Sequence, residues 1–135
     1  MKRLDGLTSL ITGANRGIGA GVAKAFANEG ANVIINYPNV SSKSEALALK
    51  HELESHNVKS VVIEADVSDP LAVRNMVSIA EDQFKNIDIL VNNAGIAAAA
   101  PVEDIDVETW DQVISVHLKG TFLTTKYVLP NTNVK

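Results

Sequence analysis

One stretch of the sequence decides the fold, TSLITGANRGIG from Thr8 to Gly19. It joins a short apolar run, Thr8 to Thr12, to a glycine-rich turn that opens a segment with helical spacing. Such a turn gathers free backbone N–H groups at the positive end of a helix dipole, where a pyrophosphate binds. A P-loop would place Lys-Ser or Lys-Thr after its last glycine, whereas this chain has Gly19-Ala20-Gly21. The stretch therefore predicts a strand, a tight turn and a helix that bind a dinucleotide.

The alternation of an apolar run with helical spacing recurs along the chain, which predicts the order β-α-β-α-β-α-β-α. The expected strands are residues 8–12, 32–36, 60–65 and 87–91. The first expected helix starts in the glycine turn and ends at Gly30. The second starts at a capping box of Ser42 and Glu45, and the third starts at Pro70. The last runs from about Asp106 to Leu129. The side chains expected to be buried are Ile18, Val22 and Phe26, then Ala46, Leu49 and Leu53, then Val73, Val77, Ala80 and Phe84, then Trp110, Val113, Ile114 and Leu118.

Units of this kind connect by right-handed crossovers, which predicts one parallel sheet with strand order 3-2-1-4. The fold class is α/β, a Rossmann-like doubly wound sheet that would stop before a fifth strand. Residues 1–135 are expected to form one NAD(P)-binding domain. The ligand crevice should lie above the carboxyl ends of the first and fourth strands, where the strand order reverses.

The composition is typical of a globular chain, and the absence of cysteine suits a reducing compartment. Hydrophobic residues make up 46% of the 135 residues and charged residues 21%, which excludes disorder as the whole description. The formal net charge of -4 lacks the basic excess that a nucleic-acid partner requires. The absence of cysteine excludes disulfides and cysteine-bound zinc, and no apolar run is long enough to span a bilayer. We expect a cytoplasmic protein with no nucleic-acid or membrane partner.

The titratable clusters do not predict a metal site. Glu103, Asp104, Asp106 and Glu108 have the pattern of a solvated turn and helix start, where the helix dipole favours acids. His51 and His56 lack acidic partners at ligand spacing and are expected at the surface.

Three further motifs accompany the glycine turn. Asp66-Val67 follows the third strand, Asn92-Asn93-Ala94-Gly95 follows the fourth, and Val116-His117-Leu118-Lys119-Gly120 lies in the last helix. With these motifs the chain, from about Leu4 to Pro130, resembles the classical branch of the short-chain dehydrogenase/reductase family. The 3-oxoacyl-carrier-protein reductases and the glucose-dehydrogenase-like members look most similar. The resemblance implies an NAD(P)-dependent oxidoreductase of class EC 1.1.1.- that transfers a hydride between nicotinamide and a carbonyl or alcohol substrate.

The resemblance also implies roles for single residues. Asp66 would hold the adenine amino group, Val67 would line the adenine pocket, and Asn92 to Gly95 would face the ribose. Asn92 and Asn93 also fit a pair of turn residues that satisfy backbone groups. The candidate cofactor-binding residues are Gly13, Asn15, Arg16, Gly17, Ile18, Gly19, Asn36, Tyr37, Ser42, Asp66, Val67, Asn92, Asn93, Ala94 and Gly95.

Charge favours NADP over NAD as the cofactor. An NAD site usually has an acid at the end of the second strand, where this chain has Asn36-Tyr37-Pro38 and no acid before Glu45. Arg16 in the glycine turn, with Ser41 and Ser42, could bind a 2′-phosphate. The alternative is a solvated Arg16 and serines that only cap the next helix.

The family's reaction needs a serine, then a tyrosine and a lysine four residues apart on a helix, and residues 1–135 contain no Tyr-x-x-x-Lys. Tyr127 is followed four residues later by Asn131. The tail from Asn131 to Lys135 also departs from the family pattern, which suggests a truncated product, an alternative reading of a gene or an expressed fragment. His117 stands where most members have an asparagine of the proton relay, so it is the candidate catalytic residue, and the alternative is a hydrogen-bonded interior histidine.

The first hypothesis is the nucleotide-binding half of an NADP-dependent reductase or dehydrogenase, inactive by itself. The rival hypotheses are a non-catalytic module that holds a dinucleotide or pairs with a related subunit, and a non-functional fragment that misfolds. The resemblance also implies an oligomer through the last helix, with Trp110 and Phe122 at its surface. The substrate and the direction of reaction do not follow from the sequence.

Overall fold

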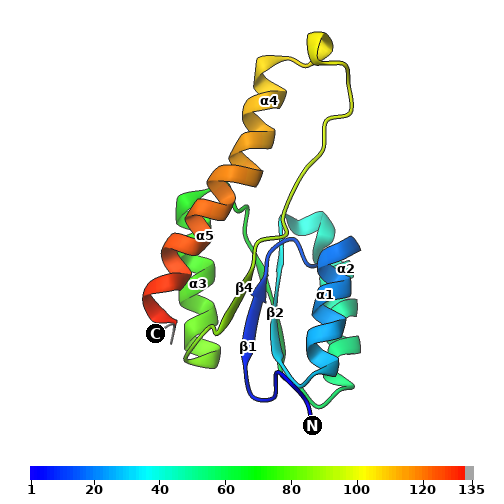
Figure 1. Ribbon diagram of the computed structural model, residues 1–135, viewed down its shortest axis with the longest axis vertical. Helices are drawn as coiled ribbons and strands as arrows, with labels where there is room; N and C mark the ends of the chain where they lie inside the picture. Colours follow the sequence, from blue (N-terminus) through cyan, green and yellow to red (C-terminus); the bar gives the residue numbers. More distant parts are fainter. Residues whose placement is uncertain (133–135) are drawn as a thin grey trace.

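The computed structural model describes residues 1–132 and confirms the α/β class (Figure 1). The strands are β1 (Thr8–Ile11), β2 (Asn32–Tyr37), β3 (Ser60–Glu64) and β4 (Ile89–Val91). Within these residues they form one parallel sheet of order β3-β2-β1-β4, as predicted. The strands end within two residues of their expected bounds, and the chain stays hydrogen-bonded past them, since Asp88 N still donates to Thr8 O over 2.8 Å.

Helices cover both faces of the sheet. Figure 1 shows α1 (Gly17–Asn28) and α2 (Lys43–Glu54) on one face, and α3 (Pro70–Phe84) and α5 (Gly120–Val128) on the other. Successive strand residues point to opposite faces, so Leu10 and Ile34 enter the core under α3 and α5 while Ile11 and Ile35 enter the core under α1 and α2. A parallel sheet covered twice needs strands that are apolar on both sides, which is why the strand sequences do not alternate with polar residues.

The buried face of α1 differs from the prediction. Ile18 is 82% exposed, and the buried residues are Gly19, Ala23 and Ala27, one position further along. Val22 and Phe26 are half-buried at the margin of the core. The small side chains let α1 lie close to the sheet, whereas a stripe of large residues would hold it away. The predicted faces of α2 and α3 are confirmed, apart from a half-buried Phe84.

The predicted starts of α2 and α3 are both confirmed, but the predicted side-chain cap forms only at α3. Asp69 caps α3 by accepting from Leu71 N at 3.0 Å, with Pro70 in the first turn. Ser42 is already helical and makes no capping hydrogen bond, so the capping box is wrong. The cap lies earlier, where the Asn39 carboxamide oxygen accepts from Ser41 N at 3.2 Å and starts the 3-10 turn Val40–Ser42.

The last helix has three parts. It begins as α4 (Val107–Ile114), continues as a π-helical segment, Ser115–Lys119, and ends as α5. The Asp106 carboxylate caps α4 by accepting from Thr109 N at 2.6 Å, and that bond lowers the pKa of Asp106. The 3-10 turn Leu129–Asn131, which contains Pro130, follows α5.

The expected packing of this helix on the sheet is wrong for Trp110 and Leu118, which are 56% and 68% exposed. Figure 1 gives the reason for Trp110, because α4 extends beyond the carboxyl end of the sheet and only α5 lies along α3, while Leu118 lies in the π-helical segment between α4 and α5. Leu123 and Val128 of α5 are the side chains that reach the core. None of the helices formed by residues 1–132 has the length and hydropathy of a membrane span.

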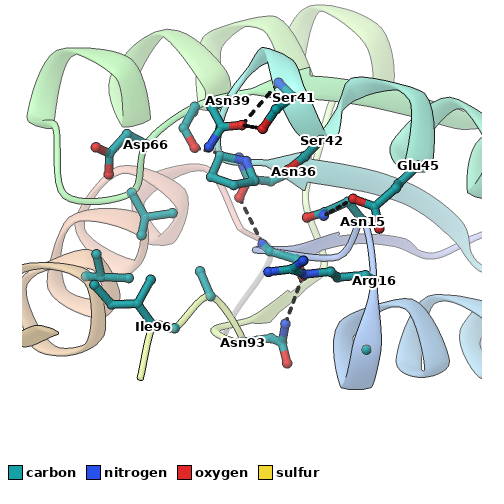
Figure 2. Close-up of a pocket in the computed structure, with 18 of the residues that line it drawn as sticks. Asn15, Arg16, Asn36, Asn39, Ser41, Ser42, Glu45, Asp66, Asn93 and Ile96 are labelled. Carbon is teal, nitrogen blue, oxygen red and sulfur yellow. Dashed lines mark hydrogen bonds between the residues drawn. The ribbon is translucent and has the colours of Figure 1, made fainter. Parts of the chain in front are cut away.

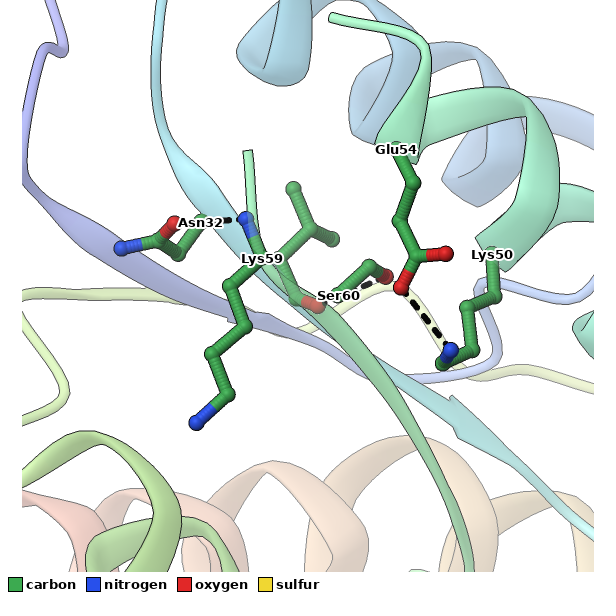
Figure 3. A network of polar contacts seen from close by, with 6 residues as sticks. Asn32, Lys50, Glu54, Lys59 and Ser60 are labelled. Atoms are coloured by element: carbon green, nitrogen blue, oxygen red, sulfur yellow. Dashed lines mark hydrogen bonds and ion pairs between the residues drawn. The ribbon is translucent and has the colours of Figure 1, made fainter. Parts of the chain in front are cut away.

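Polar contacts fix the register of β2 and β3 at the end of the sheet away from the long loops (Figure 3). Asn32 accepts from Lys59 N at 2.9 Å through its side-chain oxygen, and the Ser60 hydroxyl donates to Val33 O at 3.0 Å. Lys50 and Glu54 form an ion pair along α2 nearby, at 2.8 Å. These contacts hold the amino ends of β2 and β3. The loops at the carboxyl ends of the strands do not take part in them.

Candidate cofactor site

The loops after all four strands surround one hollow of about 750 Å³ at the carboxyl edge of the sheet (Figure 2). It lies where the strand order reverses, and its size suits an extended nucleotide ligand. The residues that line it are Gly13, Asn15, Arg16, Gly17, Ile18, Asn36, Pro38, Asn39, Ser41, Ser42, Glu45, Ala65, Asp66, Val67, Asn93, Ala94, Gly95, Ile96, Gln112 and Val116.

The glycine turn brings an uncapped helix end to this hollow. Arg16 is the N-cap of α1 with extended backbone, it makes no side-chain capping bond, and the first turn contains no acid. Gly17 has φ +61°, and a Cβ built there would meet nothing within 4 Å. The positive end of the α1 dipole therefore has no side-chain cap, and Gly17 and Ile18 of its first turn line the hollow, which is the arrangement that binds a phosphate.

A buried asparagine holds the glycine turn in place. Asn36 is 1% exposed, and its side-chain oxygen accepts from Gly13 N at 3.0 Å. Its amide donates to Ala65 O at 3.0 Å and to Ile63 O at 3.3 Å. The side chain therefore ties the turn after β1 to the end of β3 and has its hydrogen-bonding groups engaged within the protein.

A second tie joins the turn after β1 to the loop after β4. The Thr12 hydroxyl accepts from Asn93 N and from Ala94 N, both at 3.0 Å. The Asn93 amide donates in return to Thr12 O at 3.0 Å and Gly13 O at 3.1 Å. These contacts hold the two loops directly against each other, and residues of both loops line the hollow.

Two glycines make this contact sterically feasible. A Cβ on Gly19 would lie 2.5 Å from the Asn93 amide nitrogen and 2.8 Å from Gly13 O. A Cβ on Gly13 would lie 2.9 Å from Ala94 Cα. Gly19 is therefore required where the loops pack behind the hollow, and it does not line the hollow itself.

Polar side chains gather at the end of the hollow beside α2 (Figure 2). Arg16 enters from the glycine turn, and Ser41 and Ser42 come from the 3-10 turn before α2. The Asn39 carboxamide oxygen also contacts the Ser41 hydroxyl. Glu45 completes this end, 3.5 Å from the Asn15 amide.

Asp66 and Val67 form the wall after β3. The Asp66 carboxylate accepts from Ser68 N at 2.9 Å and from the Ser68 hydroxyl at 2.6 Å, both through Oδ1. Val67 is 5% exposed and packs against α5, where a Cβ on Gly120 would come within 2.7 Å of it. The wall is thus fixed by a turn on one side and by the last helix on the other.

His117 lies behind the hollow, in the π-helical segment. Its Nε2 is 2.7 Å from Ile96 O and 3.0 Å from Ile96 N. Its ring packs on Gly95, where a Cβ would lie 2.5 Å from Cε1. The side chain is exposed, and it is hydrogen-bonded to the segment that forms the wall after β4. Segments of π-helix inserted in α-helices are frequent at functional sites.

The structure brings together twelve of the fifteen candidate cofactor residues, and three lie elsewhere. Gly19 is behind the turn, as described above. The Tyr37 side chain is buried, and burial, with a smaller effect of Glu64, raises the pKa of its phenol. Asn92 points to α5, where its side chain contacts Thr124 and Thr125.

The sequence analysis did not assign cofactor binding to several residues that line the hollow, namely Pro38, Asn39, Ala65, Ile96, Gln112 and Val116. Asn39 carries a detectable signal, since an asparagine two residues before a serine is typical of an Asx turn. Gln112 and Ile96 carry none, because they reach the site only through the course of α4 and the loop before it. Among the described residues, no group of three His, Asp or Glu side chains is arranged to hold a metal ion.

Residues 8–134 match the family model described as short chain dehydrogenase. The chain belongs to the short-chain dehydrogenase family. It is 39% identical over 134 residues to the D-beta-hydroxybutyrate dehydrogenase of Cupriavidus necator, covering 98% of this chain and 50% of that protein. It is also 39% identical to the 3-oxoacyl-[acyl-carrier-protein] reductase of Staphylococcus epidermidis, covering 91% and 50%.

The fold comparison agrees with the sequence comparison. A short-chain dehydrogenase of Burkholderia cenocepacia, solved in complex with NADP, superposes with a TM-score of 0.91 at 36% identity. The superposition covers 96% of this chain and 52% of that one. The chain thus spans about half the length of the relatives it matches. The predicted resemblance to this family is confirmed, and the family is one of NAD(P)-dependent oxidoreductases.

The contact behind the glycine turn predicts a specific sensitivity to added volume. Replacing Gly19 by Ala should lower the free energy of unfolding by about 1 to 3 kcal/mol, because the new methyl group meets the Asn93 amide and Gly13 O. Urea denaturation measures the change. Gly21→Ala is the matched control, because a Cβ there meets nothing within 4 Å, and it should stabilise α1 by about 0.5 to 1 kcal/mol. Equal effects of the two substitutions would contradict the assigned contact.

Proposed function

We propose that residues 1–135 are the dinucleotide-binding half of an NADP-dependent oxidoreductase that interconverts a carbonyl and an alcohol. The observation that carries the proposal is the uncapped amino end of α1, which opens through Gly17 into the hollow. Its family membership and the NADP complex of its Burkholderia relative support the same cofactor. A ketone, aldehyde or alcohol is the substrate class that this chemistry implies.

The residues of the hollow fit the parts of a dinucleotide. In this proposal the N–H groups at the start of α1 hold the pyrophosphate, Asp66 and Val67 hold the adenine, and Asn93 to Gly95 face a ribose. The side chain of Asn36 is hydrogen-bonded to Gly13 N and Ala65 O. In this proposal Asn36 therefore fixes the turn that meets the pyrophosphate and does not bind the cofactor through its side chain. Tyr37, Asn92 and Gly19 would act through packing, since they do not line the hollow.

Arg16 supports NADP over NAD as the cofactor. Its guanidinium forms no ion pair within residues 1–132, and it shares one end of the hollow with Ser41 and Ser42. A guanidinium and hydroxyl groups are suited to a 2′-phosphate, which NADP carries and NAD lacks. The Ser41 backbone N–H and hydroxyl both donate to the Asn39 side-chain oxygen. Ser41 would therefore donate to the phosphate only after these hydrogen bonds break.

His117 is the chain's candidate for the catalytic machinery. The bound nicotinamide supplies the hydride chemistry, and the protein must supply the proton and the geometry. Nε2 is the ring nitrogen that meets Ile96, as a donor to its carbonyl or an acceptor from its N–H according to the tautomer, so Nδ1 is the nitrogen that could pass a proton. The lysine-paired tyrosine that the family uses as acid does not occur in residues 1–135.

An exposed apolar stripe supports a homo-oligomer through the last helix. The stripe consists of Val107, Trp110, Leu118, Phe122 and Leu129, each 55% exposed or more. The α4 half carries acids such as Glu108 and Asp111, and the α5 half carries Lys126. Two copies packed antiparallel along this stripe would bury the apolar residues and set each acidic half against a basic half.

The cofactor proposal predicts a selective effect of Arg16. The chain should bind NADPH more tightly than NADH, and Arg16→Ala should raise the dissociation constant for NADPH about tenfold while changing that for NADH less than about twofold. Fluorescence titration of the reduced nicotinamide measures both constants. Arg74→Ala, on the exposed face of α3, is the control for loss of one positive charge. Equal weakening of both cofactors by Arg16→Ala would refute the phosphate assignment.

The missing acid predicts binding without turnover. Residues 1–135 should oxidise no NADPH above background with ketones, aldehydes or 3-oxoacyl thioesters, because no lysine-tuned tyrosine is present. Absorbance at the nicotinamide band follows the reaction. A version extended by a relative's segment containing the serine and Tyr-x-x-x-Lys is the positive control. Clear turnover by residues 1–135 would instead assign the acid to His117 or Tyr127.

The oligomer proposal predicts that charge on the stripe prevents association. Phe122→Glu should convert the oligomer to a monomer, because a buried carboxylate would face the apolar residues of the second copy. Analytical ultracentrifugation measures the mass. Ile79→Glu on α3 places the same change at an exposed apolar residue outside the stripe and should leave the mass unchanged. A monomeric wild-type chain would rule out this interface.

A further inference from the structure

Glu45 occupies a position that the assigned phosphate contacts do not explain. It lies in the first turn of α2 and lines the hollow at the end that holds Arg16, Ser41 and Ser42 (Figure 2). Its Oε1 accepts a weak hydrogen bond from the Asn15 amide at 3.5 Å, and Asn15 is 8% exposed. The carboxylate is therefore directed at the glycine turn and does not simply extend into solvent.

The lining of the hollow carries more carboxylates than cations, and at this end one carboxylate accompanies one cation. The groups that line it include one cation, Arg16, and two carboxylates, Glu45 and Asp66. Asp66 lies after β3 and is engaged with Ser68, so Glu45 is the carboxylate on the side of Arg16. Because both Arg16 and Glu45 are exposed, water moderates their fields without removing them. A dianionic phosphate that enters beside Arg16 is attracted by the guanidinium and repelled by the carboxylate.

We propose that Glu45 is a specificity-determining residue that limits the preference of this site for NADPH over NADH. The inference rests on the proposed function, since it assumes that the hollow holds the dinucleotide. The carboxylate acts only on the ligand that carries the extra phosphate, and a ribose hydroxyl in the same place adds no charge for it to repel. Arg16 and Glu45 together thus set the ratio of the two affinities, with opposite signs.

The substitution Glu45→Gln isolates the charge from the structural contact. Glutamine keeps the length of the side chain and an oxygen that can accept from the Asn15 amide. Because Glu45 is exposed and lies in a regular helix, this exchange disturbs no core packing. Any change in the ratio of affinities then reports the lost negative charge.

The experiment titrates the wild-type chain and Glu45→Gln with NADPH and with NADH in low-salt buffer. We expect Glu45→Gln to bind NADPH about two- to fivefold more tightly, the range found for exposed charge pairs, and to bind NADH as the wild type does. In about 1 M salt the difference between the two proteins should shrink, because screening weakens a charge effect and leaves a packing effect intact. Adenosine 2′,5′-bisphosphate and 5′-AMP repeat the comparison without the nicotinamide.

Glu52→Gln is the matched control, because it removes the same charge from the same helix. Glu52 pairs with Lys24 at 3.2 Å and does not line the hollow. An equal gain in NADPH affinity in this control would assign the effect to net charge and overturn the proposal. An unchanged ratio in Glu45→Gln, with a wild type that binds both cofactors, would overturn this inference alone. A wild type that binds neither cofactor would overturn the proposed function as well.

Discussion

The architecture depends on the hydrogen bonds of one buried hydroxyl, that of Thr12. It is 2% exposed, it follows β1 directly, and it accepts from two successive backbone N–H groups of the loop after β4. Buried N–H groups without partners are costly, so this loop is held where the hydroxyl is. The turn after β1 is fixed from the other side by Asn36. Both loops line the hollow, so this part of its wall has little freedom to move.

The sheet could be predicted from the sequence because its determinants are local and general. Apolar runs of strand length, helical spacing and the right-handed crossover together imply the order β3-β2-β1-β4. The predicted buried faces of α1 and α4 are wrong because helical spacing does not show how closely a helix packs on the sheet, or whether it lies on the sheet at all. The helical spacing predicts Ile18 on the buried face of α1, whereas close packing of a helix on a sheet selects small side chains such as Ala23. Trp110 lies on a helix that extends past the sheet, which spacing along the chain cannot reveal.

Site residues could be predicted from the sequence where they belong to a motif that requires a particular backbone conformation. Residues that reach the site only because distant chain segments pack together could not be predicted. The glycine turn, Asp66 and Asn93 come from motifs with a physical reason, and all of them reach the hollow or its walls. Gln112 and Ile96 line it because α4 and its preceding loop pass nearby, and nothing in their local sequence marks them. Asn36 illustrates a third case, since the sequence placed it at the cofactor and the structure engages its side chain with backbone groups of the turn and of β3.

The tie between Thr12 and Asn93 joins residues 81 positions apart, and this distance has a consequence for the order of folding. The units from β1 to β3 pair through crossovers of moderate length, whereas β4 must find β1 after the whole intervening chain has been placed. Contacts of such long range form late, because the entropy of closing a large loop is lost before they contribute stability. We therefore expect the hollow to form only late in folding. A nucleotide that fits it stabilises only the finished native state, so it slows unfolding without guiding collapse.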